Sequence, residues 1–296
     1  MSEAGAPRPL VVGLVGAGPW ATNVLAPMLA AGPETTLAGV WTPSGASARG
    51  LAVAHGAHAF ESFEALVAHV DAVAFAVPPG AQAELAGRAA RAGRHLLLDK
   101  PLAFDVPAAE RVVAAVEAAG VVTQLMLTHR YRAATREWLE GARAARPERA
   151  RLTFLSGAFV RGPYANAWRR EYGVLHDLGP HAFDLLEALL GPIEGVMGSG
   201  DLRRSVKLAF THAGGAVSEA ELSGVSELPK TVFTIECECE TGTLAFDAVA
   251  ASSESPWAEV RRSFARAVHG GARPAHDAAR GLALQRAIAR ALVALK

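Results

Sequence analysis

The sequence predicts an α/β protein in which an N-terminal doubly wound parallel sheet is followed by a C-terminal α+β domain with an open, mostly antiparallel sheet. Short apolar segments alternate with segments of helical length through residues 8–128, and the first apolar segment ends in a glycine-rich turn. After about residue 130, several segments alternate apolar with polar residues. Continuous apolar runs are typical of strands buried on both faces, whereas alternation indicates one solvated face. We therefore expect two domains, at residues 8–128 and 129–296.

The first half contains six apolar runs of strand length, separated by five segments with helical periodicity. The strands are expected at residues 10–15, 35–41, 57–60, 72–77, 95–98 and 121–127. The helices are expected at residues 23–31, 46–55, 63–69, 81–91 and 106–119. Ser62 can cap the third helix because its hydroxyl accepts a backbone N–H. This alternation predicts parallel strands joined by right-handed crossovers.

The second half has a different order of elements. A strand is expected at residues 151–160 and a helix from about residue 177 to 190, where Gly191-Pro192 is a strong stop signal. Several antiparallel strands are expected between residues 193 and 246, because apolar and polar residues alternate there. The chain then returns to helix at residues 257–268 and 275–295.

The composition favours a small-molecule partner. The 296 residues include 29 basic and 29 acidic ones, so no net charge attracts nucleic acid or an anionic membrane. No apolar run approaches the roughly 20 residues of a membrane span, and the N-terminus lacks the apolar core of a signal peptide. We expect a cytoplasmic protein.

The two cysteines, Cys237 and Cys239, lie two residues apart on a predicted strand. Their side chains would point to the same face but are poorly placed to bond each other. A disulfide framework is therefore excluded, which fits a reducing compartment. A zinc pair remains an alternative, although no second ligand pair is near in the sequence.

The glycine-rich turn has the pattern Gly16-x-Gly18-x-x-Ala21, after a predicted strand and before a predicted helix. The first glycine permits the tight turn, the second lets the backbone approach a pyrophosphate, and Ala21 permits close packing of helix on strand. Pro19 and Trp20 fall in the first helical turn, where free N–H groups attract phosphate. The turn predicts a dinucleotide site, with a purely structural turn as the alternative.

The end of the second strand bears on the choice between NAD and NADP. An acidic residue for the ribose hydroxyls is expected about 20 residues after the glycine turn. The sequence there is Trp41-Thr42-Pro43-Ser44, without a carboxylate. Thr42, Ser44 and Arg49 can bind a 2′-phosphate, so the sequence leans towards NADP and leaves NAD open. The alternative for Arg49 is an ordinary exposed helix residue.

Three leucines at residues 96–98 read as a buried strand that ends in Asp99-Lys100-Pro101. Pro101 cannot continue the strand because it has no N–H to donate. Lys100 therefore stands at the carboxyl end of a sheet, where open α/β folds bind their ligands. A solvated turn lysine is the alternative.

A second group of polar residues comprises Asp177, His181 and Asp184. If a helix starts near Asp177, all three share one face, and Pro180 places the helix start nearby. A histidine in the first turn is favoured as neutral imidazole, which can take a proton at neutral pH. The alternatives are a capping aspartate with a core histidine, or a metal site that also uses His176.

Taken in order, Gly16-Ala17-Gly18, Asp99-Lys100-Pro101 and Asp177-x-Gly179-x-His181-x-x-Asp184 make the chain resemble the Gfo/Idh/MocA family of glucose–fructose oxidoreductase and inositol dehydrogenase. The resemblance runs over nearly the whole length. Further matches are residues 73–79, His129-Arg130-Tyr131 and Trp168-Arg169.

The resemblance implies an N-terminal dinucleotide-binding Rossmann domain and a C-terminal substrate-binding and oligomerisation domain. The implied reaction is NAD(P)-dependent hydride transfer between nicotinamide and a secondary alcohol or ketone of a sugar, cyclitol or similar hydroxylated molecule. Lys100 would polarise the oxygen, His181 or Lys100 would move the proton, and Asp177 would orient the substrate. No resident metal is implied, and a homodimer or homotetramer through the C-terminal sheet is expected.

The residue patterns and the resemblance together give the expected contacts with cofactor and substrate. Those expected to bind cofactor are Gly16, Gly18, Pro19, Trp20, Ala21, Thr42, Ser44, Arg49, Val77, Pro78, Pro79, Gln82, Asp99 and Lys100. Those expected to bind substrate are Lys100, Arg130, Tyr164, Trp168, Arg169, Asp177 and His181, with Arg161 and Asn166 as further candidates for the pocket lining. For residues 161–169 the alternative is a surface loop with one buried tryptophan.

The sequence also departs from the family pattern. Asp99 replaces the usual glutamate, Gln82 stands where many relatives have a histidine, and Ala21 replaces the third glycine. These departures leave two other functions open: a cofactor-binding regulator without turnover, and an epimerase or hydrolase that uses bound cofactor transiently.

Overall fold

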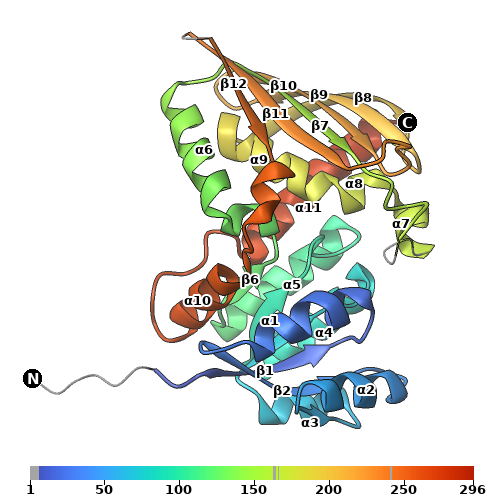
Figure 1. The fold of residues 1–296 in the computed structure, drawn as a ribbon, viewed down its shortest axis with the longest axis vertical. Coiled ribbons are helices and arrows are strands. Elements are labelled where there is room, and N and C mark those ends of the chain that lie inside the picture. The colour runs from blue at the N-terminus through green and yellow to red at the C-terminus, as the bar shows by residue number, and fades with distance from the viewer. Residues whose placement is uncertain (1–6, 163–164, 166, 241) are drawn as a thin grey trace, which may run out of the picture. The chain divides into compact units, whose positions relative to one another are not determined.

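The computed structural model describes residues 7–162, 165, 167–240 and 242–296, which group into two compact units. The first unit comprises the chain up to Ala103, Pro107–Met126 and Trp257–Leu282. The second comprises Phe104–Val106, Leu127–Pro256 and Ala283–Lys296. Each unit carries one six-stranded sheet (Figure 1). The first sheet is parallel and the second is mixed but mostly antiparallel, so the predicted fold class is confirmed.

The sheet of the first unit has the strand order β3-β2-β1-β4-β5-β6. Its strands are β1 (Leu10–Val15), β2 (Thr35–Trp41), β3 (His58–Ala59), β4 (Ala72–Phe75), β5 (His95–Leu98) and β6 (Thr123–Leu125). The central strands are covered on both faces, and all four residues of β4 are fully buried. The order reverses direction between β1 and β4, and open α/β sheets bind ligands at the carboxyl ends of the strands at such a point.

Helices join these strands as predicted, with local differences. They are α1 (Ala26–Ala30), α2 (Ala46–Ala54), α3 (Phe63–His69), α4 (Pro79–Arg91) and α5 (Val106–Ala119). A π-helical turn, Ala21–Leu25, precedes α1. The Ser62 cap of α3 is confirmed, because the Ser62 hydroxyl accepts a hydrogen bond from the Ala65 N–H at 3.1 Å.

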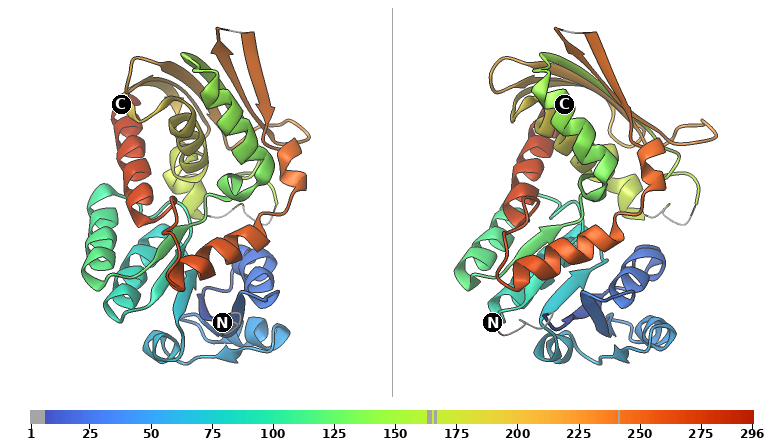
Figure 2. Two further views of the ribbon diagram at one scale, coloured as in Figure 1. Left: turned by 90° about the vertical axis from the view of Figure 1, so that its left-hand side faces the viewer. Right: turned by 60° about the vertical axis from the view of Figure 1, so that its left-hand side comes forward.

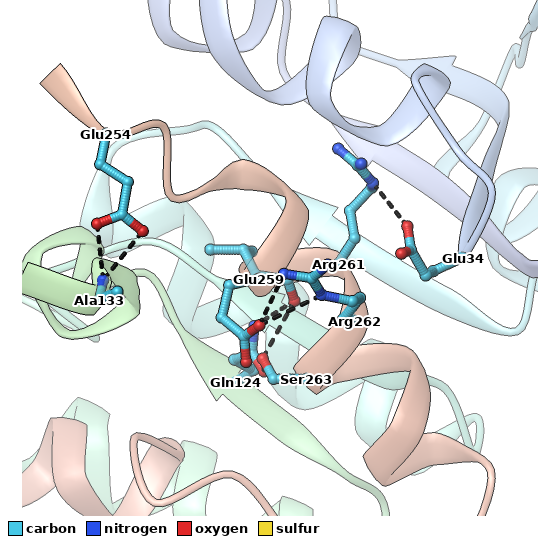
Figure 3. A network of polar contacts seen from close by, with 9 residues as sticks. Glu34, Gln124, Ala133, Glu254, Glu259, Arg261, Arg262 and Ser263 are labelled. Atoms are coloured by element: carbon cyan, nitrogen blue, oxygen red, sulfur yellow. Dashed lines mark hydrogen bonds and ion pairs between the residues drawn. The ribbon is translucent and has the colours of Figure 1, made fainter. Parts of the chain in front are cut away.

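The first unit also includes α10 (Trp257–Val268), which is distant in sequence from the strands that it packs beside. The buried Gln124 side chain of β6 donates to the Val260 carbonyl at 2.9 Å and accepts from the Ser263 hydroxyl at 2.8 Å (Figure 3). Arg261 forms an ion pair with Glu34 at 3.0 Å. These polar contacts join residues 257–282 to the first unit, and the sequence pattern within residues 257–268 does not indicate them.

The sheet of the second unit has the order β12-β11-β7-β10-β9-β8, in which only the β7–β10 pair is parallel among the described residues. Its strands are β7 (Arg149–Leu155), β8 (Ile193–Asp201), β9 (Ser205–His212), β10 (Val217–Ser223), β11 (Val232–Cys239) and β12 (Gly242–Asp247). The strand expected at residues 151–160 ends at Leu155, because the Ser156 hydroxyl accepts from the Ala158 N–H and starts a turn. Buried and exposed residues alternate along β9, as expected for a sheet with one covered face.

Helices cover one face of this second sheet. The helices of this unit are α6 (Ala133–Ala144), α7 (Ala167–Tyr172), α8 (Val174–Asp177), α9 (Gly179–Leu190) and most of α11 (Ala278–Ala294). Both views of Figure 2 show the green α6 and yellow α9 on the same side of the sheet. Helix α6 has no counterpart among the predicted elements. In the described part of the chain, no helix is long and apolar enough to cross a membrane.

Candidate functional site

The glycine turn follows β1 and has the geometry that the sequence motif requires. Gly16 has φ +117°, and a Cβ on this residue would lie 2.3 Å from the Ala76 carbonyl oxygen. Only glycine fits there. A Cβ on Gly18 would meet nothing within 4 Å, so the backbone of this exposed residue is open to a ligand. Ala21 is fully buried and allows the close packing of helix and strand that the motif predicts.

The end of β2 carries a cluster of hydroxyl groups. The Thr42 and Ser47 oxygens are 3.2 Å apart, and the Ser44 and Ser47 oxygens are 3.0 Å apart. Arg49 is exposed, and its guanidinium lies over Gly45 at the start of α2. The sequence pattern identified Thr42, Ser44 and Arg49 but missed Ser47. Its position three residues after Ser44, in the first turn of α2, is the signal that could have identified it.

Gln82 binds the loop that carries Lys100, a role that the sequence did not indicate. It is 1% exposed, and its Nε2 donates to the Asp99 carbonyl at 2.8 Å. The same nitrogen lies 3.2 Å from each of the carbonyls of Pro101 and Leu102, and its Oε1 accepts from the Asp99 N–H at 2.8 Å. The amide expected to contact cofactor is thus occupied in holding residues 99–102.

Within that loop, the Lys100 N–H donates to the Asp99 carboxylate at 2.8 Å, and the side chains of both residues are half-buried. The loop leaves β5 at the carboxyl end of the sheet, as predicted. Nearby at the end of β4, Val77 is half-buried, Pro78 is exposed and Pro79 starts α4 as a buried residue. Among the cofactor candidates in this region, Gln82 has a buried side chain that makes its hydrogen bonds to the backbone of the Lys100 loop.

Asp177 and His181 lie on two successive helices, which corrects the single helix expected from residue 177. Asp177 ends α8, and α9 begins at Gly179 with Pro180 in its first turn. Proline lacks the N–H that would continue the hydrogen bonding of α8, so the chain breaks at Leu178. His181 falls in the first turn of α9, as predicted. Gly191, with φ +92°, ends α9 at the predicted position.

The buried Asp177 carboxylate forms an ion pair with Arg169 of α7. Arg169 Nε lies 3.0 Å from Asp177 Oδ2, and the two side chains are 16% and 6% exposed. Arg169 was expected to contact substrate. The structure instead places its guanidinium beside Asp177, a residue that was expected to act in the reaction.

His181 is half-buried, and its ring lies edge-on to His129, with ring centroids 5.2 Å apart. The next residue after His129, Arg130, donates to the Asp184 carboxylate at 3.2 Å. Asp184 is 1% exposed, so Arg130 supplies the positive charge that a buried carboxylate needs. The histidine and arginine predicted after the sixth strand are therefore neighbours of α9, although Arg130 was expected to bind substrate.

His176 cannot serve the metal site that the sequence left open. Its ring nitrogens face the carbonyl oxygens of Tyr172 at 3.1 Å and Phe104 at 3.0 Å. Among the residues described, no group of three or more His, Cys, Asp or Glu is suited to hold a metal ion.

Burial, followed by the neighbouring Cys239, raises the pKa of the Cys237 thiol to about 11, so this thiol stays protonated at neutral pH.

The remaining substrate candidates lie near α7. Trp168 is half-buried, and its ring centroid is 6.2 Å from that of Phe104. Arg161 donates to the carbonyl of Ser226 at 2.9 Å, which indicates a structural role for this side chain. Tyr164 and Asn166 lie outside the described residues.

A protein-family model matches residues 10–127. The matching model, GFO_IDH_MocA, is described as an oxidoreductase family with an NAD-binding Rossmann fold. The matched residues run from the start of β1 to the end of the Met126-Leu127 segment after β6. They include the glycine turn and the Lys100 loop.

Two curated relatives share sequence with parts of the chain. The dTDP-3,4-didehydro-2,6-dideoxy-alpha-D-glucose 3-reductase of Streptomyces violaceoruber is 31% identical over 194 residues, which are 62% of this chain and 55% of the relative. The enzyme of the same name from Actinomadura kijaniata is 33% identical over 117 residues, 39% of this chain and 35% of the relative. The aligned part thus spans about half or less of the curated relatives.

Several solved structures share the fold over nearly the whole chain. GenD2 from gentamicin A biosynthesis, in complex with NAD, has a TM-score of 0.86 at 21% identity, covering 99% of this chain and 97% of that one. UDP-N-acetylglucosamine 3-dehydrogenase GnnA from Acidithiobacillus ferrooxidans has a TM-score of 0.87 at 20% identity, covering 98% of each chain. Levoglucosan dehydrogenase, in complex with NADH and L-sorbose, has a TM-score of 0.82 at 19% identity, covering 97% of each chain. At these identities the likeness shows a common fold.

Proposed function

We propose that the chain is a member of the Gfo/Idh/MocA family and an NAD(P)-dependent oxidoreductase that transfers a hydride between nicotinamide and a secondary alcohol or ketone of a sugar. The matching family model, described as an oxidoreductase family with an NAD-binding Rossmann fold, covers residues 10–127, most of which lie in the first unit. The substrate, the preferred cofactor and the residues that carry the reaction are proposals as well.

The observation that carries the proposal is the arrangement of the first sheet. The glycine turn follows β1, and the Lys100 loop follows β5, which is separated from β1 by β4 alone. Both therefore stand at the carboxyl edge of the same parallel sheet, close to the point between β1 and β4 where strand order reverses. The open space above Gly18 fits a pyrophosphate, since a side chain there would occupy it. Lys100 then stands on the same edge as the proposed cofactor site.

When bound, the nicotinamide supplies the acceptor or donor of the two-electron hydride. The chain must then move one proton, because an alcohol that loses a hydride also loses its hydroxyl proton. We assign that proton to His181, whose place in the first turn of α9 favours a neutral imidazole. Lys100 polarises the substrate oxygen, and the Asp177 carboxylate orients the substrate.

For the substrate we propose a nucleotide-linked sugar that reacts at carbon 3. Both curated relatives are named as 3-reductases of a dTDP-linked sugar, and GnnA is named as a 3-dehydrogenase of a UDP-linked sugar. A cyclitol or free sugar is the broader class that the same chemistry allows. The equal numbers of basic and acidic residues, 29 of each, fit a small substrate of this kind.

For the cofactor we propose NADP. The hydroxyls of Thr42, Ser44 and Ser47 gather within 3.0–3.5 Å of one another, and no carboxylate follows β2 to repel a phosphate. Arg49 supplies the positive charge.

We expect fluorescence titration to show tighter binding of NADP than of NAD. The Ser47→Asp variant should bind NADP about tenfold more weakly, roughly 1.4 kcal/mol, and should bind NAD as tightly as the wild type does. Equal weakening of both would contradict the assignment.

We also propose that the outer face of the second sheet joins copies of the chain in a homodimer or homotetramer. This face carries ion pairs of Arg151 with Glu219 at 3.3 Å and of Arg149 with Glu238 at 3.5 Å. Met197, 71% exposed, supplies an apolar side chain on β8. Mixed charges of both signs beside an apolar residue suit contact with a copy of the same surface.

The proposed function is tested by incubating the protein with NADP or NAD and a panel of dTDP- and UDP-linked sugars, cyclitols and free sugars, and by following NAD(P)H absorbance. We expect turnover with a nucleotide-linked sugar. Lys100→Ala and His181→Ala should each lower it by roughly 10²–10⁴, the usual effect of losing an acid or base. Turnover close to wild type in both variants would place the chemistry elsewhere.

Absence of turnover with every member of the panel, despite measurable cofactor binding, would favour a regulator or an enzyme that uses cofactor transiently. Conversion of a sugar without net change in NAD(P)H would identify the transient use.

A further inference from the structure

We infer that Arg169 is a positioning residue that holds the Asp177 carboxylate in place, and that it is not a substrate ligand. The inference rests on the proposed function, in which Asp177 orients the substrate. It begins from the ion pair between Arg169 Nε and Asp177 Oδ2, which are 3.0 Å apart. Arg169 lies in α7 and Asp177 is the last residue of α8, and Gly173 separates these two helices.

The backbone between them is built to bring them together. Gly173 separates α7 from α8 with φ +75°, and a Cβ on it would lie 2.1 Å from the Leu202 carbonyl oxygen. The Gly173 N–H donates to the Arg169 carbonyl at 2.8 Å, and the Val174 N–H donates to Leu202 at 2.9 Å. Because only glycine fits this turn, the direction in which α8 leaves α7 is fixed, and with it the approach of Arg169 to Asp177.

A second set of contacts holds the same two helices. The ring nitrogens of His176, one residue before Asp177, lie 3.1 Å from the Tyr172 carbonyl oxygen of α7 and 3.0 Å from the Phe104 carbonyl oxygen, and a neutral ring donates to one of the two. The Phe104 ring stacks on that of Tyr172, with centroids 3.7 Å apart and an interplanar angle of 10°. Helix α8 therefore cannot move away from α7 without losing these contacts, so the ion pair sits on a rigid support.

Burial gives the ion pair its effect. The Asp177 side chain is 6% exposed, and a buried carboxylate without a cation is strongly disfavoured. Arg169 also lies over the Trp168 ring, with its central carbon 4.9 Å from the ring centroid. Stacking on the Trp168 ring and the ion pair with Asp177 both favour keeping the guanidinium beside the carboxylate, although its Nε is not in hydrogen-bond geometry. The ion pair thereby holds the Asp177 carboxylate beside α7.

The two roles for Arg169 predict different kinetics. A substrate ligand contributes binding energy of its own, so its loss raises KM whatever residue stands at position 177. A positioning residue acts through Asp177, so its loss lowers kcat and has no further effect once the carboxylate is gone. A small displacement of a reacting group is enough, since about 1 Å can cost on the order of 10²-fold.

The test is a double-mutant cycle of Arg169→Met and Asp177→Asn, measured with cofactor and substrate in the full-length protein. We expect each single variant to lower kcat by on the order of 10²-fold and the double variant to be no slower than Asp177→Asn alone. Arg169→Lys, which keeps the charge but not the planar geometry, should recover part of the loss. The matched control is Arg170→Met, which removes an exposed arginine from the same helix and should leave kcat and KM unchanged.

Multiplicative losses in the double variant, or a rise in KM with unchanged kcat in Arg169→Met, would overturn the inference. Equal losses in Arg170→Met would attribute the effect to helix α7 in general and would overturn it too. If the Arg169→Met variant does not fold, the Arg169→Lys variant is measured in its place. We then expect a wild-type KM with a reduced kcat. A wild-type protein without turnover contradicts the proposed function itself, before any variant is compared.

Discussion

At the scale of single residues, Gln82 is the clearest case of a side chain whose role the sequence pattern did not indicate. It stands where many members of the family have a histidine, and its amide bonds both the N–H and the carbonyl of Asp99. Those contacts hold the loop that carries Lys100. Replacing Gln82 should therefore lower both the stability of the fold and the rate of turnover.

We expect Gln82→Met to lower the free energy of unfolding by about 1–3 kcal/mol, because buried backbone groups lose their partner. Turnover should fall as well, because Lys100 is no longer held. Chemical denaturation and steady-state kinetics measure the two effects. Glu84→Met, an exposed change on the same helix, is the control. Unchanged stability and turnover in Gln82→Met would show that the loop keeps its conformation unaided.

The residue scale also shows what local sequence can predict. Gly16 was identified because its turn needs a backbone conformation that glycine alone tolerates, and Ser62 because a cap acts on the residues next to it. The partners of Arg169 and Arg130 were not predictable in the same way. Both side chains were expected to bind substrate, yet each pairs with a buried carboxylate whose position depends on packing of helices.

At the scale of elements, the strands of the first sheet were predicted closely because each is an apolar run between turn residues. Helix boundaries were less accurate. The break at Leu178 between α8 and α9 follows from Pro180, whose missing N–H interrupts the helix. The position of α10 depends on contacts such as Gln124 with Val260, 136 residues apart, which no pattern within the helix reveals.

The start of β5 carries a pH-dependent contribution to stability. His95 Nδ1 accepts a hydrogen bond from the Val122 N–H at 3.0 Å, which requires the neutral ring. Burial lowers the pKa of His95 below its usual value of 6.5. Below that pH the unfolded chain binds a proton that the folded chain does not, so stability falls as pH decreases. At neutral pH and above, both states are neutral and the contribution is constant.

We therefore expect the free energy of unfolding to decrease as pH falls from 7 through the range below about 6.5, by at most roughly 1.4 kcal/mol per pH unit from this group. His95→Asn keeps an acceptor but cannot be protonated, so its unfolding free energy should depend less on pH. Denaturation series across this range measure the difference, with the exposed His58→Asn as control. The same pH dependence in wild type and His95→Asn would contradict this account.

At the scale of the whole molecule, the predicted fold class is confirmed for both units. Continuous apolar runs predicted the parallel sheet, and alternation of apolar and polar residues predicted the mostly antiparallel sheet. The grouping of residues 257–282 with the first unit was beyond such patterns, since it depends on which surfaces meet after the chain has folded. The resemblance to the Gfo/Idh/MocA family and its cofactor-binding fold was recognised from three short motifs in order, none of which is specific alone.

The proposed assembly makes a prediction at this scale. Size-exclusion chromatography with light scattering should show a dimer or tetramer, and Met197→Lys on β8 should shift it towards monomer. The control is Val53→Lys, which changes a residue that is 82% exposed on α2 of the first unit. A monomeric wild-type protein at every concentration tested would rule out this use of the sheet.

The central claim is hydride transfer, and isotope labelling tests it most directly. NADPH that carries deuterium at the transferable position of nicotinamide C4 is incubated with the keto form of a nucleotide-linked sugar that the enzyme accepts, and the product is analysed by mass spectrometry. We predict one deuterium on the ring carbon that bore the ketone, and its loss in parallel with turnover in His181→Ala. Product without deuterium would show that the hydrogen came from solvent and would contradict the proposed mechanism.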